Sequence, residues 1–254
     1  MSQYSSMDWK SKKFWTDGWG SIFLAIMVAL TIRWAFFEAY VIPSGSMFPS
    51  LLLHDHIFVN KFVYGLRVPF SEKWLVKFSE PKRGDVVVFK YPRDMSTFFI
   101  KRVVGLPGDR IYYERGTLYI NDQPVEKVVP KDTSDLDWMR DADFVRDGNP
   151  YDSKSNYVHW TEKLGDKDHS ILLRKGEGPY VSYGPETVPP DHLFMMGDNR
   201  DNSSDSRFWG FLPMKNILGR ASMVWLSCEE LVPNVDFLCN PLTIRFKRFF
   251  HTVN

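Results

Sequence analysis

The segment at residues 42–52, IPSGSMFPSLL, places three serine hydroxyls, one glycine and two prolines in a short stretch with apolar flanks. A loop of this composition could present a serine to a substrate. An ordinary turn is an equally good interpretation, since glycine and proline commonly follow the end of a helix. A serine hydroxyl is a weak nucleophile at neutral pH and needs an adjacent base. The segment therefore indicates acyl-transfer chemistry only if another part of the chain supplies that base.

Histidine is the first base to consider, and the chain has six. No GxSxG elbow surrounds any serine, and His54 and His56 stand two apart in a strand-like run without an evident acidic partner. A His-x-His pair on one strand face could also bind a metal ion, but no third ligand is evident nearby. Neither a histidine base nor a histidine metal site is therefore favoured.

Lysine is the alternative base, and Lys101 is the best candidate. It stands at the centre of TFFIKRVVG, an apolar run predicted to form a strand, with Phe99 and Val103 on its own face. Burial disfavours the ammonium form, and lowering a lysine pKa from about 10.4 to near 7.5 represents roughly 4 kcal/mol of differential desolvation. The neutral amine could then accept a serine proton. A single strand lysine more commonly extends its stem to solvent, so context must decide.

A third polar segment, MGDNRDNSSDSRFWG, occupies residues 196–210. It does not have EF-hand spacing, because with Asp201 in the first position Ser206 stands where glycine belongs. A network of hydrogen bonds between loops is the better interpretation. The only Ser-x-x-Lys, Ser79 to Lys82, contains a proline and has no Lys-Thr-Gly companion, which argues against a penicillin-recognising site.

Length and composition limit the classes that remain. With 254 residues and 44% hydrophobic content, the chain can form an anchor and one catalytic domain with an insertion. A net charge of +1 gives no general attraction to nucleic acid, so no nucleic-acid partner is expected. Two cysteines, Cys228 and Cys239, exclude a four-cysteine zinc site, and their spacing leaves both a disulfide and two free thiols open.

An apolar stretch precedes the serine segment. Residues 18–32 carry no charge, and aromatic residues flank them on both sides. Because about 20 helical residues cross a bilayer, we expect a transmembrane anchor at residues 18–40, in which Arg33 reaches the far interface. A cleaved signal peptide is the alternative, but bulky residues follow Ile32 where a cleavable signal needs small ones.

Charge asymmetry predicts the orientation of this anchor. Lys10, Lys12 and Lys13 precede the span, whereas the first basic residue after Arg33 is Lys61. The positive-inside rule therefore predicts a cytoplasmic N-terminus at residues 1–17, with everything after the anchor outside the cytoplasm.

Short β-rich runs separated by Gly, Pro and Asp follow the anchor, so the fold is predicted to be mainly β. We expect a catalytic β domain formed by residues 41–110 and 191–254. Residues 111–190 are predicted to form a hairpin and a charged insertion lobe. Within it, residues 131–170 are rich in charge but punctuated by aromatic side chains, which favours a partly packed surface lobe over a disordered tail.

Taken together and in this order, PSGSMFPS, IKRVVGLPGD and GDNRDNSSDSR resemble the motifs of bacterial type I signal peptidases, and RGDVVVF at residues 83–89 fits the same pattern. The resemblance implies a Ser/Lys dyad with Ser46 as nucleophile and Lys101 as general base. It also implies that the Ser44 hydroxyl and the Ser46 amide form the oxyanion hole, and that Ser203 orients the Lys101 amine through a hydrogen bond.

The resemblance further implies two supporting ion pairs and a substrate pocket. Asp198 would pair with Arg102, and Asp205 with Arg207. A shallow pocket for small side chains would be lined by Ile42, Pro43, Met47, Leu51 and Ile100. The chain departs from several members in its single predicted span and in the positions of its cysteines.

The implied activity is endopeptidase removal of signal peptides from exported preproteins after small residues, of Ala-x-Ala type, without a metal or other cofactor. The expected partners are preproteins and membrane lipid. The expected location is the bacterial cytoplasmic membrane, with a single span and an extracytoplasmic catalytic domain. TIRFKRFF at residues 243–250 could lie against anionic headgroups or form an edge strand with a solvated face.

Two alternatives share some of these features. A self-cleaving Ser/Lys protease like the SOS-response repressors needs an N-terminal DNA-binding domain, and here the predicted span occupies that place. A catalytically silent, membrane-anchored β module that binds envelope proteins stays open, because spacing in sequence does not show whether Ser46 and Lys101 meet.

Overall fold

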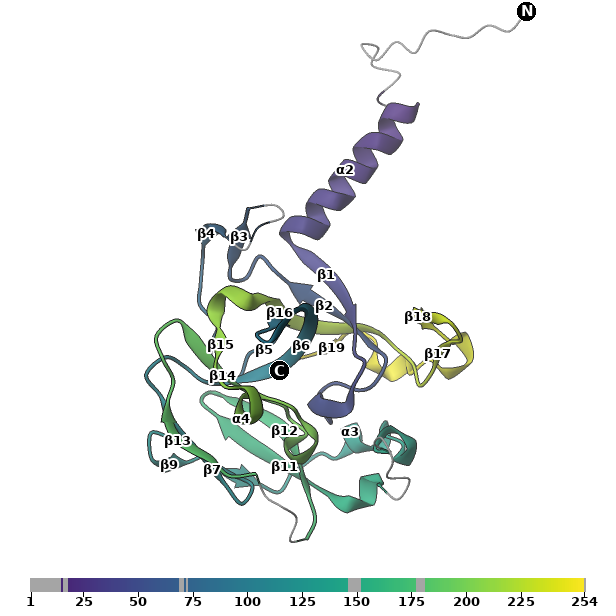
Figure 1. The fold of residues 1–254 in the computed structure, drawn as a ribbon. Helices are drawn as coiled ribbons and strands as arrows, with labels where there is room; N and C mark the ends of the chain where they lie inside the picture. The colour runs from purple at the N-terminus through teal and green to yellow at the C-terminus, as the bar shows by residue number, and fades with distance from the viewer. Residues whose placement is uncertain are drawn as a thin grey trace, which may run out of the picture.

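The computed structural model describes residues 15, 18–68, 71, 73–145, 152–176 and 181–253. These residues form a mainly β protein with few helices, as the sequence predicts. Figure 1 shows helix α2 (Trp19–Ala35) projecting from a body of short strands. The other α-helices, α3 (Ser134–Asp137) and α4 (Ser206–Trp209), are single turns.

The largest sheet is antiparallel and carries the segments of the candidate site. Its strands follow the order β1-β2-β16-β5-β6-β14-β15, and β19 also pairs with β16. Their bounds are β1 (Phe37–Val41), β2 (Asp55–Asn60), β5 (Val86–Tyr91), β6 (Asp94–Gly105), β14 (His192–Met196), β15 (Leu212–Pro213), β16 (Ile217–Ser227) and β19 (His251–Thr252).

Strand β5 shows why parts of this sheet are continuously apolar in sequence. It lies between β16 and β6, and its side chains enter two different apolar clusters. Val86 and Val88 belong to one cluster, and Val87 and Phe89 belong to the other. A strand covered on both faces buries every side chain, so the usual alternation of polar and apolar residues is lost.

Residues 110–187 supply two smaller sheets, which lie at the end of the body away from α2 (Figure 1). One contains β13 (Tyr183–Thr187), β7 (Arg110–Glu114), β8 (Thr117–Ile120) and β9 (Gln123–Pro124), and the other contains β10 (Lys127–Val128), β11 (Tyr157–Leu164) and β12 (Lys167–Arg174). Two hairpins complete the fold: β3 (Gly65–Arg67) with β4 (Trp74–Lys77), and β17 (Leu231–Val232) with β18 (Val235–Cys239). The division of the chain into domains at residues 110 and 190 stays a prediction.

The described part of the charged segment 131–170 packs against the rest of the molecule. Phe144 contacts Phe48, with ring centroids 5.3 Å apart, and Tyr157 lies 4.9 Å from Phe144. These rings share one buried cluster with Leu172. The apolar residues that interrupt the charges therefore fasten the segment to the loop that contains Ser46.

The predicted transmembrane helix at residues 18–40 is too long. Helix α2 ends at Ala35, and Phe37–Val41 form β1, which pairs with β2. The apolar sequence after Arg33 carries no stop signal for a helix, and the choice of strand comes from this tertiary pairing. Within the described ranges, no helix is both long and apolar enough to span a membrane. The N-terminal lysines used for orientation lie outside the described residues.

Residues 243–250 form neither the predicted edge strand nor a surface on which all three cations are exposed. The segment contains the 3-10 turn η7 (Phe246–Arg248), not an edge strand. Arg248 is buried and donates to an Asp55 carboxylate oxygen at 2.8 Å, and Arg245 is buried and donates to the Leu53 carbonyl at 3.0 Å. Only Lys247 of the three cations is exposed, so two of them serve the fold and are not turned toward a lipid surface.

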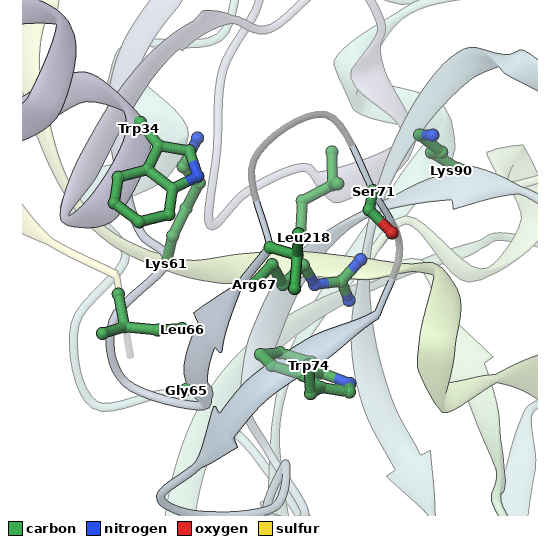
Figure 2. A pocket seen from close by; sticks show the side chains of 10 residues that line it. Trp34, Lys61, Gly65, Leu66, Arg67, Ser71, Trp74, Lys90 and Leu218 are labelled. Carbon is green, nitrogen blue, oxygen red and sulfur yellow. The ribbon is translucent and has the colours of Figure 1, made fainter.

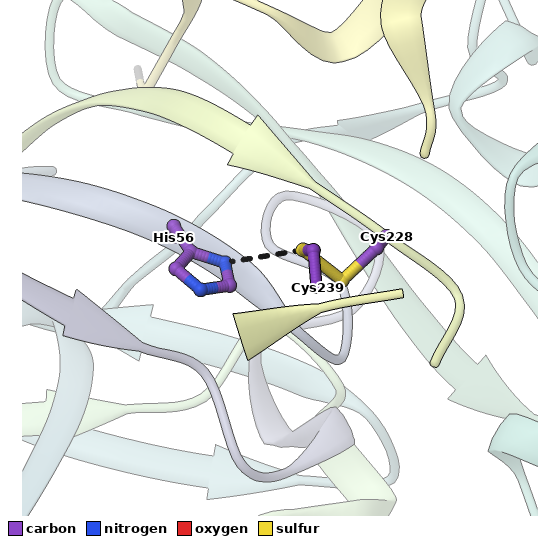
Figure 3. Close-up of side chains that lie close together, drawn as sticks. All are labelled: His56, Cys228 and Cys239. Atoms are coloured by element: carbon purple, nitrogen blue, oxygen red, sulfur yellow. Dashed lines mark hydrogen bonds between the residues drawn. A yellow bond between two sulfur atoms is a disulfide. The ribbon is translucent and has the colours of Figure 1, made fainter. Parts of the chain in front are cut away.

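Cys228 and Cys239 form a disulfide, which decides the alternative that their spacing left open. Figure 3 shows His56 beside this bond, with its Nδ1 atom 3.8 Å from the sulfur of Cys239. The histidine thus approaches two cysteines, but both sulfurs are already bonded to each other. His54 does not join this group, because its ring contacts the Glu229 carbonyl.

Candidate active site

The serine loop, residues 42–54, connects β1 to β2 and holds Ser46 in a 3-10 turn, η1 (Gly45–Met47). Met47, Phe48 and Leu51 are fully buried and anchor the loop to the body. A side chain at Gly45 would meet the Phe48 ring at 2.7 Å, so this turn requires glycine. The apolar half of the loop therefore fixes the serine half against the sheet.

Lys101 meets Ser46 directly. Its Nζ atom lies 2.5 Å from the Ser46 Oγ atom, and both side chains are buried. Lys101 is 4% exposed, and its Nζ lies 5.6 Å from the centroid of the Phe99 ring, which the sequence predicts on the same face. The expected dry environment of this lysine is confirmed.

Burial lowers the pKa of Lys101 to about 8, although the charges of Asp205 and Asp198 act in the opposite direction. Among the described residues, Lys101 has no ion pair with a carboxylate. With a pKa of about 8, about a tenth of the Lys101 side chains are neutral at pH 7, because this pH lies about one unit below the pKa. The amine can therefore accept the Ser46 proton near neutral pH.

Ser44 lies at the open side of this pair. Its hydroxyl is 3.3 Å from the Ser46 Oγ atom, and its side chain is exposed, so it faces the space a substrate would enter. A hydroxyl at this position can donate to a developing oxyanion beside the serine.

The polar loop, residues 197–205, connects β14 to α4 and lies against the serine loop. Within it, Asp198 accepts two hydrogen bonds from Arg102, at 2.8 and 2.7 Å, and both side chains are completely buried. Asp205 accepts two from the Arg207 guanidinium, both at 2.8 Å, and further bonds from the Arg207 amide at 3.3 Å and the Gly197 amide at 3.0 Å. Both predicted ion pairs are present.

Each of these carboxylates stays charged despite its burial. Burial alone raises the pKa of Asp198, but the Arg102 charge outweighs it and the pKa is lowered. The pKa of Asp205 is lowered in the same way by Arg207. The two aspartates thus form a fixed charged environment beside Lys101.

The predicted hydrogen bond from Ser203 to Lys101 is not formed. Ser203 is buried, but its hydroxyl has no hydrogen-bond partner among the described residues. It lies beside Gly197, where an added Cβ would come within 2.2 Å of the Ser203 Oγ atom and 2.4 Å of the Ser46 carbonyl oxygen. The Lys101 amine points to Ser46 instead.

Sequence reasoning missed two residues of this site, Gly197 and Asn199. Gly197 leaves the space in which the serine and polar loops meet. Asn199 donates from its backbone amide to the Ser46 carbonyl at 3.1 Å, and from its side chain to the Gly45 carbonyl at 3.1 Å. An amide within a dense polar segment was the available signal, but its partner lies about 150 residues away in the chain.

A cleft of about 630 Å³ opens beside Ser46 and Lys101. Pro43 and Ile100 line it as predicted, but Ile42, Met47 and Leu51 do not, because they are buried in the apolar cluster that also contains Ile100. They form the support beneath the cleft. Its other lining residues are Ser44, Gly45, Leu53, Thr97, Phe98, Phe99, Asp143, Val145, Asn202 and Ser204.

A second hollow, of about 500 Å³, lies between the end of α2 and the β3–β4 hairpin. Figure 2 shows Trp34 beside Lys61 on one side of it, and Arg67 stacked over Trp74 on another. Neither Ser46 nor Lys101 lines this hollow. The cleft beside Ser46 is therefore the candidate active site.

Comparison with known proteins shows the family of the chain. A family model described as "Signal peptidase, peptidase S26" matches residues 15–226. The chain is 39% identical over 232 residues to "Signal peptidase I" of Pseudomonas fluorescens, covering 87% of this chain and 75% of that protein. It is 32% identical over 275 residues to "Signal peptidase I" of Haemophilus influenzae, covering 92% and 74%.

Among solved structures, a signal peptidase I from Enterococcus faecalis is 26% identical and covers 57% of this chain and 98% of its own, with a TM-score of 0.32.

Proposed function

Because this chain belongs to the signal peptidase I family of serine endopeptidases, peptidase S26, we propose that it removes signal peptides with Ser46 as nucleophile and Lys101 as general base. The 2.5 Å contact between these two side chains is the observation that carries the proposal. Burial keeps enough Lys101 neutral to act as a base, and no histidine lines the cleft.

The mechanism follows from this geometry. Neutral Lys101 accepts the Ser46 proton as the serine oxygen attacks the scissile carbonyl, and the resulting ammonium donates that proton to the leaving amine. The acyl-enzyme is then hydrolysed by a water that Lys101 deprotonates. We assign the oxyanion hole to the Ser44 hydroxyl and the Ser46 amide, a kind of interaction whose loss costs about 2.7 to 4 kcal/mol.

We also propose a preference for small side chains at the first and third positions before the bond, as in Ala-x-Ala. Ile100 lines the cleft, while Ile42, Met47 and Leu51 fill the space beneath it in the same cluster. A cleft with so densely packed a floor stays shallow, and a shallow pocket favours alanine over larger residues. The ion pairs of Asp198 and Asp205 support the site by fixing the polar loop.

For the location, we propose that α2 lies in a bacterial cytoplasmic membrane, with the β-rich body on the extracytoplasmic side. Apolar side chains are exposed around this helix, Phe23, Leu24 and Leu30 among them. A helix that is apolar all round requires an apolar surrounding. The β3–β4 hairpin adds exposed Leu75 and Val76 near the same end of the body.

The test is cleavage of a preprotein with an Ala-x-Ala site by the detergent-solubilised chain, with Ser46→Ala as control. We expect a shortened product from the wild type and none from the variant. A folded wild-type chain that leaves the preprotein intact would contradict the proposal and favour a silent β module.

A further inference from the structure

The polar loop has a second neighbour besides the serine loop, the β11–β12 hairpin of the inserted segment. The Leu172 amide on β12 donates to the Asp198 carbonyl at 2.9 Å, and the Arg174 amide donates to the Asp201 carboxylate at 2.8 Å. Leu172 and Asn199 also form an isolated parallel bridge. The backbone of β12 therefore holds the polar loop along the side opposite Ser46.

A buried ion pair reinforces this contact. Arg200 of the polar loop donates to both carboxylate oxygens of Glu162 on β11, at 2.8 and 2.5 Å. Its Nε atom donates to the Gly197 carbonyl at 3.2 Å, so the pair is tied to the residue against which the two loops meet. Both charged side chains are inaccessible to solvent. Burial alone raises the pKa of Glu162, but Arg200 outweighs it, so the carboxylate is charged.

His169 on β12 lies between two ion pairs. It stands opposite Glu162 in the register, and its Nε2 atom is 3.4 Å from a Glu162 oxygen and 3.4 Å from Arg200. The same atom is 3.9 Å from Asp198, which pairs with Arg102. Burial and the nearby Arg102 charge lower the pKa of His169, so the ring is neutral at neutral pH.

The polar loop connects the β11–β12 hairpin to Ser46. Asn199 follows Asp198 directly, and its amide donates to the Ser46 carbonyl at 3.1 Å. The path from Glu162 to Ser46 thus consists of the ion pair with Arg200, the peptide bond between Arg200 and Asn199, and the hydrogen bond from Asn199 to Ser46, and all four residues are buried. A shift of the polar loop would move the carbonyl of the reacting serine.

We propose that the β11–β12 hairpin positions the catalytic serine through the polar loop, with Glu162 and His169 as positioning residues. This inference rests on the proposed function of Ser46 and Lys101. It gives the segment that contains β11 and β12 a role in the reaction, because contacts from this hairpin help to set the distance between the Ser46 Oγ atom and the Lys101 Nζ atom.

The test is steady-state cleavage by the full, detergent-solubilised chain carrying Glu162→Gln. This variant keeps the side chain's shape and removes its charge. We expect kcat to fall at least tenfold while KM stays within twofold, because misplaced reacting groups lose rate and Glu162 does not line the cleft.

The pH profile provides a readout that lost stability alone would not move. Lys101 is surrounded by Asp205, Asp198, Arg207 and Ser46. A loosened polar loop admits water to the Lys101 amine and so raises its pKa, and the acidic limb of kcat should move to higher pH.

Two variants of His169 test its part in this contact. His169→Gln, which keeps a hydrogen-bonding group, should retain more activity than His169→Phe.

Glu126→Gln is the matched control, because Glu126 pairs with Lys163 in the same lobe at 3.0 Å and both are exposed. It should leave kcat unchanged. Asp201→Ala serves as a second variant in case Glu162→Gln does not fold, since it removes only the partly exposed acceptor of the Arg174 amide. We expect a fall of a few-fold.

Wild-type kcat and an unmoved acidic limb in a folded Glu162→Gln chain would overturn the proposal. If that variant does not fold, wild-type kcat in Asp201→Ala overturns it. Ser46→Ala in the same assay separates this result from failure of the proposed function, because the function stands whenever the wild type cleaves and Ser46→Ala does not.

Discussion

The buried arginines beside the candidate site and the buried Lys101 respond to burial in opposite ways. Arg102, Arg200 and Arg207 each face a carboxylate in a bidentate arrangement, and their partners stay ionised. Among the residues that the structure describes, Lys101 has a serine hydroxyl as its one hydrogen-bond partner, and burial lowers its pKa to about 8. A buried charge with an ionic partner keeps its charge, whereas a buried amine without such a partner loses its proton more readily, as the proposed role of Lys101 requires.

Lys101→Met tests most directly whether the buried lysine acts as the base, because it keeps the length of the side chain and removes the amine. We expect preprotein cleavage to fall by at least about 1,000-fold, because the serine loses its base. The free energy of unfolding in urea should stay equal or rise, since a buried amine that has no ion-pair partner among the described residues is removed. Substantial cleavage by the purified variant would sink the lysine-base hypothesis.

Arg102→Met should lower the free energy of unfolding, in contrast to Lys101→Met. Removing one partner of a buried pair leaves Asp198 unpaired, which costs about 3–5 kcal/mol of unfolding free energy. Arg110→Met at the exposed pair with Asp122 should cost at most about 1 kcal/mol. Urea titrations of both variants measure the difference, and equal losses would mean that burial does not distinguish the pairs.

Gly197→Ala tests the space where the polar and serine loops meet. The added methyl group would overlap the Ser203 hydroxyl and the Ser46 carbonyl, so one loop must shift. A displacement of about 1 Å at reacting groups can cost about 100-fold in rate, and we expect a loss of that order in kcat. Gly176→Ala, whose methyl group would meet no atom within 4 Å, adds backbone strain at a φ of +88° but no overlap at the site, so its kcat should stay near the wild-type value even if its stability falls.

The pH dependence of cleavage reports the lysine directly. Because the neutral amine is the active form, kcat/KM should rise about tenfold per pH unit below pH 8 and level off above it. The sign follows from the lowered pKa, which makes the neutral form dominant at a pH where an ordinary lysine is charged. A limb near the ordinary value of 10.5 would show that burial does not tune this residue.

Local sequence selected Lys101 as a candidate base, while its burial was left open and Ser46 was singled out by the family resemblance. The structure places Lys101 in a buried position within the mostly apolar strand β6. The pair's contact was reached through resemblance, because no spacing in sequence reports a distance between residues 55 positions apart.

The predictions from sequence were wrong where contacts between distant segments determine the structure. Phe37–Val41 follow the helix without an intervening glycine or proline, and pairing with β2 makes them a strand. Met47 and Leu51 were predicted to line the cleft, but their depth beneath Ile100 depends on how the serine loop folds back onto the sheet. The link from Glu162 to Arg200 joins two charged segments whose polar composition predicts exposure, whereas both side chains are buried.

The buried pair between Arg248 and Asp55 has a consequence for the order of events during synthesis. Asp55 begins β2, directly after the serine loop, and its carboxylate accepts a hydrogen bond from the Leu52 amide, yet its arginine partner is 193 residues further along the chain. The ribosome therefore makes Ser46 and Asp55 long before Arg248, the side chain that pairs with Asp55. This buried pair forms only once residue 248 has been made, so the contact cannot help the nascent serine loop to fold.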